Sequence, residues 1–120
     1  MLRVLLAEDD PDIQRVVRLA LRRDFHVTAA NNGQEALASV AETRPDVILL
    51  DWTMPELDGL ETCTRLKADP ETRDIPVIFL TARSQESEIG QGLALGAIGY
   101  VTKPFDALSL GAHLRELLSR

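Results

Sequence analysis

Five short apolar runs in the sequence alternate with longer windows in which apolar residues recur at helical spacing. The runs cover residues 3–7, 25–30, 46–51, 75–81 and 99–102. Short apolar runs are typical of strands, and the longer windows are typical of amphipathic helices. Because strands and helices alternate along the whole chain, the pattern predicts an α/β fold with a parallel sheet.

The runs differ in how apolar they are, and this difference predicts their places in the sheet. Runs 3–7, 46–51 and 75–81 are almost wholly apolar, as expected of strands that are covered on both faces. The second run contains His26 and Thr28, and the fifth run is short. We therefore expect the first, third and fourth strands at the centre of the sheet and the other two at its edges.

Start and stop signals delimit five expected helices. Asp10 can cap the first helix, and Pro11 suits the first helical position. The second helix is expected at residues 33–43, the third from Asp58 to about residue 69, the fourth at about 84–95 and the fifth at about 106–118. Gly90 and Gly92 each cost the fourth helix about 1 kcal/mol relative to alanine, so we expect it to be the least stable.

Apolar residues at helical spacing indicate which side of each helix faces the core. They are Ile13, Val16, Val17 and Ala20 in the first helix, Leu60, Cys63 and Leu66 in the third, and Leu110, Leu114 and Leu117 in the fifth. Leu108 does not share the spacing of the fifth helix. We expect its side chain to be exposed.

The third run ends at a carboxylate on a short loop. Four apolar residues without a polar break lead directly into Asp51. Pro55 restricts Met54 to extended conformations, and the pair Asp58-Gly59 is typical of a turn or helix start. Asp51 is therefore predicted at the carboxyl end of a central strand, the edge of an open α/β sheet at which ligands bind.

A second group of acids follows the first run. If the first and third strands are neighbours, Glu8, Asp9 and Asp10 meet Asp51 in one crevice. Carboxylates about 4 Å apart repel by a few kcal/mol per pair, and a divalent cation removes that cost. Because oxygen ligands suit Mg²⁺ and Asp10 is better explained as a helix cap, we assign Glu8 and Asp9 to the metal. Taken singly, each acid would be an ordinary surface charge.

A hydroxyl group and an ammonium group are predicted at the same edge of the sheet. Thr81 ends the fourth run, and Lys103 follows the fifth. Alone, Thr81 would be a strand-end cap and Lys103 a surface lysine. Together with a carboxylate and a divalent cation, they are the groups that phosphoryl transfer to an aspartate requires. The carboxylate attacks in line, and the cation, amine and hydroxyl stabilise the phosphoryl oxygens.

With these elements in order, the whole chain resembles the receiver domain of bacterial two-component response regulators, the CheY-like superfamily. The residues that carry the resemblance are Glu8-Asp9, the segment DWTMPELDG at 51–59, Leu80-Thr81-Ala82, Gly96-Ala97, Tyr100 and Lys103-Pro104-Phe105. The resemblance implies an α/β, flavodoxin-like (βα)5 three-layer sandwich whose parallel sheet has the strand order 2-1-3-4-5. It also implies one receiver domain over residues 1–120.

The resemblance implies roles for the matching acids and the lysine. Asp51 would accept a phosphoryl group from a histidine kinase or a histidine phosphotransfer protein. Asp9, Asp51 and the backbone carbonyl of Thr53 would bind Mg²⁺, for which Mn²⁺ could substitute. Glu8 would act mostly through water, and Lys103 would form a salt bridge with Asp51 or with the phosphoryl group.

The resemblance also implies a switch. Thr53 and Ala82 would contact the phosphoryl group. Thr81 would move toward it, and Tyr100 would turn inward in response. The surface of the fourth helix, fifth strand and fifth helix would then bind a downstream protein, a fused output domain or a second phosphorylated copy. Such a domain catalyses its own phosphorylation and dephosphorylation, so we expect a switch and not a turnover enzyme. The bond before Pro104 would be cis.

Length, composition and net charge limit the number of domains, the compartment and the binding partners that we expect. The 120 residues fit one domain. No apolar run approaches the roughly 20 residues of a membrane-spanning helix, and no signal peptide precedes the first run. With Cys63 as the single cysteine, we expect a cytoplasmic protein without membrane contact. The net charge of −6 argues against direct nucleic-acid binding. Residue 120 could be the natural end or the junction to an output domain.

Three other functions fit parts of the pattern. Mg²⁺-dependent aspartyl phosphatases of the haloacid dehalogenase kind share the strand-end aspartate, hydroxyl and lysine. They place a second aspartate where Thr53 stands, and this chain has no room for their substrate-covering cap. A receiver-like scaffold that never takes phosphate would lack one of the acidic, threonine or lysine positions, and none is lost. A flavodoxin would have a Ser/Thr/Gly-rich phosphate loop where Glu-Asp-Asp-Pro stands.

Overall fold

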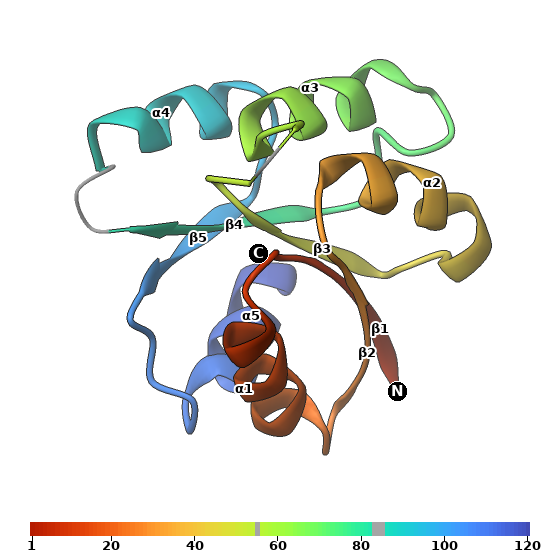
Figure 1. Cartoon of the computed structure of the whole chain (residues 1–120). Helices are drawn as coiled ribbons and strands as arrows, with labels where there is room; N and C mark the ends of the chain where they lie inside the picture. Colours follow the sequence, from red (N-terminus) through yellow and green to blue (C-terminus); the bar gives the residue numbers. More distant parts are fainter. Residues whose placement is uncertain (55, 83–85) are drawn as a thin grey trace.

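The computed structural model describes residues 1–54, 56–82 and 86–120, and its five parallel strands lie in the order β2-β1-β3-β4-β5 (Figure 1). The strands are β1 (Leu2–Ala7), β2 (Phe25–Ala30), β3 (Val47–Asp51), β4 (Val77–Ala82) and β5 (Gly99–Lys103). The helices are α1 (Pro11–Leu21), α2 (Gly33–Thr43), α3 (Gly59–Ala68), α4 (Glu86–Ala94) and α5 (Leu110–Leu118). The predicted fold class and strand order are confirmed.

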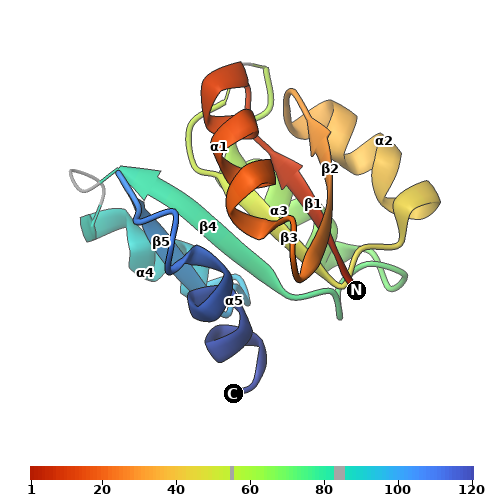
Figure 2. The ribbon, with the colours of Figure 1, turned by 90° about the horizontal axis from the view of Figure 1, so that it is seen from below.

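Helices cover both faces of the sheet and produce three layers (Figure 1). α1 and α5 lie on one face, which is the side seen in Figure 2, and α2, α3 and α4 lie on the other. One core cluster joins Val17 and Leu114 to the strands, and a second joins Val40 and Leu66 to them. Every residue of β3 is buried, as the apolar run predicted for a central strand.

The core-facing side of α1 differs from the prediction at one position. Val16 is 43% exposed, whereas Val17 and Leu21 are buried. Ile13 and Ala20 pack against the same core cluster. The helix therefore turns the stripe formed by these four residues toward the sheet, and Val16 lies on the flank of that stripe. Its assignment to the core was wrong, although its spacing was compatible with burial.

α5 begins later than predicted. The helix starts at Leu110 because Asp106 forms a turn instead of a first helical residue. The Asp106 carboxylate accepts a hydrogen bond from the Leu108 N–H at 3.0 Å, and its carbonyl accepts one from the Ser109 N–H at 3.1 Å. Aspartate side chains that bond nearby backbone groups compete with helix formation. The predicted core stripe of α5 is confirmed, and Leu108 is 98% exposed as expected.

Two predictions concern positions outside the described residues. These are the effect of Pro55 on the loop after β3 and the start of the fourth helix near residue 84. The end of that helix is described, and α4 finishes at Ala94, one residue before the predicted end. Among the helices of the described ranges, none combines the length and the apolar character needed to cross a bilayer.

Candidate functional site

The carboxyl ends of β1 and β3 bring three acids together. The two strands are hydrogen-bonded neighbours, and Ala7 lies opposite Leu50. Glu8 and Asp51 come next along the chain, so they lie side by side at the carboxyl ends of the two strands. Glu8, Asp9 and Asp51 each offer a carboxylate oxygen, and these oxygens lie within 4.8 Å of one another. The acids are neighbours, as the strand order predicted, and their roles as metal ligands stay a prediction.

Lys103 reaches the same cluster from the end of β5. Its Nζ lies 3.0 Å from Asp51 Oδ1 and 3.2 Å from Glu8 Oε1. The Glu8 and Asp51 side chains are 1% and 5% exposed, whereas that of Lys103 is 25% exposed. The expected salt bridge to Asp51 is present, and the peptide bond between Lys103 and Pro104 is cis. The contact between Lys103 and Glu8 was not predicted.

Burial controls the protonation of this cluster. Burial, with the nearby charge of Asp51, raises the pKa of Glu8 to about 7, although a hydrogen bond from the Asp10 N–H and the charge of Lys103 oppose the shift. Burial also raises the pKa of Asp51 against the stabilising effect of Lys103. For Lys103, burial disfavours the charged form, but Asp51 and Glu8 outweigh it and raise the pKa. Two buried carboxylates thus share one ammonium group, so the site favours a further cation.

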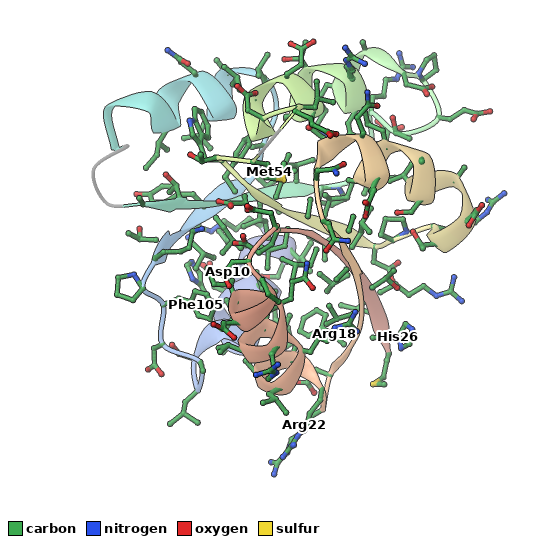
Figure 3. All side chains as sticks on the ribbon, viewed as in Figure 1. Asp10, Arg18, Arg22, His26, Met54 and Phe105 are labelled. Carbon is green, nitrogen blue, oxygen red and sulfur yellow. The ribbon has the colours of Figure 1, made fainter. Side chains whose placement is uncertain are left out.

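Asp10 has a structural role. Its side chain lies at the start of α1 (Figure 3) and accepts a hydrogen bond from the Asp12 N–H at 2.8 Å. This confirms Asp10 as the N-cap of α1. Glu8 and Asp9 are the acids after β1 that do not cap the helix. Together with Asp51 they provide oxygen donors only. This donor set fits Mg²⁺, a hard cation that binds few protein oxygens and keeps several waters.

The acids and the lysine line one pocket of about 350 Å³. Its lining consists of Glu8, Asp9, Asp10, Ile13, Asp51, Thr53, Ala82 and Lys103. Thr53 and Ala82 therefore line the same pocket as Asp51, and their contact with a phosphoryl group stays a prediction. The backbone N–H of Thr53 also donates a hydrogen bond to the Asp51 carboxylate.

Thr81, predicted to move toward the phosphoryl group, and Tyr100, the predicted switch residue, lie on neighbouring strands. Thr81 is the second-last residue of β4 and is 1% exposed, and its hydroxyl lies 3.2 Å from the Ala82 carbonyl oxygen. Tyr100 lies on β5 opposite Phe79 of β4, and its side chain is 40% exposed. Thr81 is therefore buried, and Tyr100 is at the surface. Their coupled movement stays a prediction.

The loop after Asp51 is packed too closely for any side chain at Gly59. A Cβ there would lie 2.3 Å from the Asp51 carbonyl oxygen and 2.9 Å from the Trp52 Cα. The Gly59 N–H donates to the Trp52 carbonyl at 3.0 Å, and Asp58 caps α3 through the Glu61 N–H at 2.8 Å. This glycine therefore lets the loop fold back against the residue that carries the carboxylate.

Trp52 connects this loop to the helical layer. Its ring meets that of Phe79 edge to face, with centroids 4.9 Å apart, and its side chain is 8% exposed. A Cβ at Gly92 of α4 would lie 2.6 Å from the Phe79 ring and 3.2 Å from the Trp52 ring. The only tryptophan thus adjoins Asp51 in the chain and packs beneath α4, which makes it a fluorescent reporter of this region.

Comparison with known proteins points to one family. A family model described as the response regulator receiver domain matches residues 4–115. The phosphate regulon transcriptional regulatory protein PhoB of Pseudomonas aeruginosa is 41% identical over 118 residues, which cover 98% of this chain and 52% of PhoB. The transcriptional regulatory protein CseB of Streptomyces coelicolor is 46% identical over 118 residues, which cover 98% of this chain and 49% of CseB.

A solved structure agrees with these relatives. The chemotaxis response regulator CheY4 of Vibrio cholerae has a TM-score of 0.90 and 30% sequence identity, and the match covers 98% of each chain. The present chain spans about half the length of the curated relatives it matches. The strand order, the acidic edge of the sheet and the family match over nearly the whole sequence lead to one conclusion: this chain belongs to the response regulator receiver domain family.

Proposed function

We propose that this chain is a phosphoacceptor of a two-component phosphorelay and that Asp51 receives the phosphoryl group. One observation carries the proposal. The buried Asp51 carboxylate lies 3.0 Å from the Lys103 ammonium group and shares its pocket with Glu8 and Asp9. A phosphohistidine of a histidine kinase or of a histidine phosphotransfer protein would be the donor.

In the proposed reaction an oxygen of the Asp51 carboxylate attacks the phosphorus atom. A P–O bond forms, the P–N bond to the donor histidine breaks, and the electron pair of that bond remains on the imidazole nitrogen. Lys103 would pair with a phosphoryl oxygen, since its Nζ already contacts Asp51. Thr53 and Ala82, which line the pocket, would contact the remaining oxygens, and Thr81 would move toward them.

Glu8, Asp9, Asp51 and the backbone carbonyl of Thr53 are the proposed holders of Mg²⁺, and Mn²⁺ would substitute for it. The oxygen-only cluster supports this assignment, because its three carboxylates lie close enough to share one ion. When bound, Mg²⁺ supplies positive charge for the phosphoryl oxygens. Following the family resemblance, we assign direct contact to Asp9 and Asp51 and a water-mediated role to Glu8; both Asp51 and Glu8 also contact Lys103.

The proposed output is a change in the surface formed by α4, β5 and α5. Phosphorylation adds negative charge at Asp51, which would draw the Thr81 hydroxyl toward the phosphoryl group and let Tyr100 turn inward. Gly90 and Gly92 lower the stability of α4 and hence the cost of this change. A downstream protein or a fused output domain would bind the altered surface. The domain would act as a self-phosphorylating and self-dephosphorylating switch and not as a turnover enzyme.

Phosphate uptake by Asp51→Asn tests the proposal. The protein is incubated with acetyl phosphate and Mg²⁺, and intact mass reports the addition of one phosphoryl group. Asp74→Asn is the matched control, because Asp74 is an exposed aspartate before β4, at the opposite edge of the sheet. We expect uptake by the wild type and by Asp74→Asn and none by Asp51→Asn. Equal uptake by Asp51→Asn would show that another residue accepts the group.

A further inference from the structure

The side-chain amide of Gln14 joins two loops at the acidic edge of the sheet. Gln14 lies in α1 and is half-buried. Its Nε2 donates a hydrogen bond to the backbone carbonyl of Glu8 at 2.5 Å and another to Asn31 Oδ1 at 3.0 Å. One NH₂ group therefore ties the β1–α1 loop, which carries Glu8 and Asp9, to the β2–α2 loop.

The β2–α2 end of this connection is itself fixed. Glu35 Oε1 accepts hydrogen bonds from the Asn31 backbone N–H at 3.0 Å and from Asn31 Nδ2 at 3.2 Å. The Glu35 N–H donates to Asn32 Oδ1 at 2.8 Å, which caps α2. Because both ends of the Asn31 amide are engaged, its Oδ1 is held in the direction of Gln14. The start of α2 thus provides a rigid base for the Gln14 amide.

The β1–α1 loop depends on a small number of such contacts. The Glu8 N–H donates to the Ala30 carbonyl at 3.0 Å, and its carbonyl is the group that Gln14 binds. In the described part of the chain, the exposed carboxylate of Asp9 makes no hydrogen bond and no ion pair. The backbone on either side of Asp9 therefore sets the place of that carboxylate relative to Asp51.

We infer that Gln14 is a positioning residue for the acid cluster. Its amide holds the β1–α1 loop in the conformation that brings Glu8 and Asp9 beside Asp51, and Asn31 extends this control to the start of α2. Among the described residues, the Gln14 amide bonds the Glu8 carbonyl and Asn31 and makes no hydrogen bond to the acidic side chains or the lysine, so it acts through the Glu8 backbone. The inference rests on the proposed function, because it concerns the affinity of these acids for Mg²⁺.

Mg²⁺ titration monitored by Trp52 fluorescence tests the inference. Gln14→Met keeps the length of the side chain and removes both donors. We expect the Mg²⁺ dissociation constant to rise about 3- to 10-fold, which is at or below the lower limit of the roughly 10- to 100-fold loss that removal of a metal ligand's direct partner causes, because Gln14 acts through the backbone. Gln34→Met is the matched control, because Gln34 is exposed at the start of α2 and its side chain makes no hydrogen bond in the described residues. This control is expected to bind Mg²⁺ like the wild type.

Asn31→Ala provides a second and independent variant. If Asn31 acts by holding the Gln14 amide, Asn31→Ala weakens Mg²⁺ binding less than Gln14→Met does, and the double variant is no weaker than Gln14→Met alone. Full additivity would overturn this part of the inference. Hydrogen exchange of the metal-free protein supplies a readout without any ligand. The amides of residues 8–10 should exchange faster in Gln14→Met, while those of β3 keep their wild-type rates.

The outcomes separate this inference from the proposed function. If the wild type binds Mg²⁺ and takes up phosphate at Asp51, and Gln14→Met binds Mg²⁺ with the wild-type dissociation constant, the inference is wrong and the function stands. If the wild type shows no Mg²⁺ response, the proposed function and the inference fall together. The rate of phosphorylation, measured at increasing Mg²⁺ concentrations, provides a further test. At saturating Mg²⁺ the rate of Gln14→Met should approach that of the wild type, whereas its half-saturating Mg²⁺ concentration should be higher.

Discussion

Lys103 at the end of β5 and Glu8 after β1 form an ion pair of 3.2 Å, although β3 and β4 lie between their strands. The same ammonium group contacts Asp51 at 3.0 Å. Lys103 is therefore the only cation in contact with two carboxylates that are almost fully buried, within the described part of the chain. The charge balance of the site depends on this one side chain.

Replacement of Lys103 should destabilise the metal-free protein in a pH-dependent way. Lys103→Met leaves the buried carboxylates without their cation, and we expect a loss of about 1–3 kcal/mol in the free energy of unfolding at pH 8. The loss should be smaller at pH 6, because protonated carboxyl groups need no cationic partner. Urea unfolding at the two pH values measures both effects.

Lys67→Met is the control for this prediction. Lys67 donates hydrogen bonds to the carbonyl oxygens of Arg73 and Ile75 at 2.9 and 3.0 Å, and it forms no ion pair with a carboxylate of the described residues. Its replacement should cost stability equally at pH 6 and pH 8. A pH-independent loss in Lys103→Met would contradict the assignment of a charge-balancing role.

Mg²⁺ binding should weaken as the pH falls from 8 to 6. Glu8 has a raised pKa of about 7, so its carboxylate is mostly ionised at pH 8 and mostly protonated at pH 6. Because protons compete with the cation, one such group changes the apparent dissociation constant by about tenfold over this range. Mg²⁺ titrations at pH 6 and pH 8, followed by Trp52 fluorescence, measure this change in the dissociation constant. Glu8→Gln should bind Mg²⁺ more weakly than the wild type at pH 8, and its dissociation constant should change less with pH. An equal change with pH in both proteins would contradict the assignment of this pH dependence to Glu8.

A methyl group at Gly59 should damage the loop beneath Asp51. The Cβ of Gly59→Ala would lie 2.3 Å from the Asp51 carbonyl oxygen, a backbone atom that has little freedom to move. We expect a loss of about 1–3 kcal/mol in the free energy of unfolding and weaker Mg²⁺ binding. Gly90→Ala is the matched control, because a Cβ there meets nothing within 4 Å. It should stabilise α4 by about 0.5–1 kcal/mol. Equal stability of the two variants would contradict the packing account.

The sheet could be predicted because its three central strands are almost wholly apolar runs, whereas the second run contains His26 and Thr28 and the fifth is short. Helix details were less certain, since spacing alone does not say which flank of a stripe meets the sheet. Val16 has the right spacing and is exposed, whereas Leu21 completes the stripe. The start of α5 was missed because the Asp106 side chain bonds the Leu108 N–H and favours a turn.

The acids of the site could be predicted because parallel strands end at a common edge. The Glu8–Lys103 pair could not, since it depends on how far a flexible lysine side chain reaches across two strands. Gln14 was missed for a similar reason. A glutamine in an amphipathic helix carries no sign that its amide meets the Glu8 carbonyl and Asn31. The resemblance predicted the salt bridge between Lys103 and Asp51, and the excess of acids over bases at this edge was the available signal for a second carboxylate partner.

Direct mapping of the phosphorylated residue tests the central claim most closely. The wild-type protein is phosphorylated with acetyl phosphate and Mg²⁺, reduced with borohydride to trap the aspartyl phosphate as homoserine, and digested for peptide mass spectrometry. The account predicts conversion at Asp51 and at no other aspartate, and none when Mg²⁺ is removed by chelation. Conversion at another aspartate, or none at all in the presence of Mg²⁺, would contradict it.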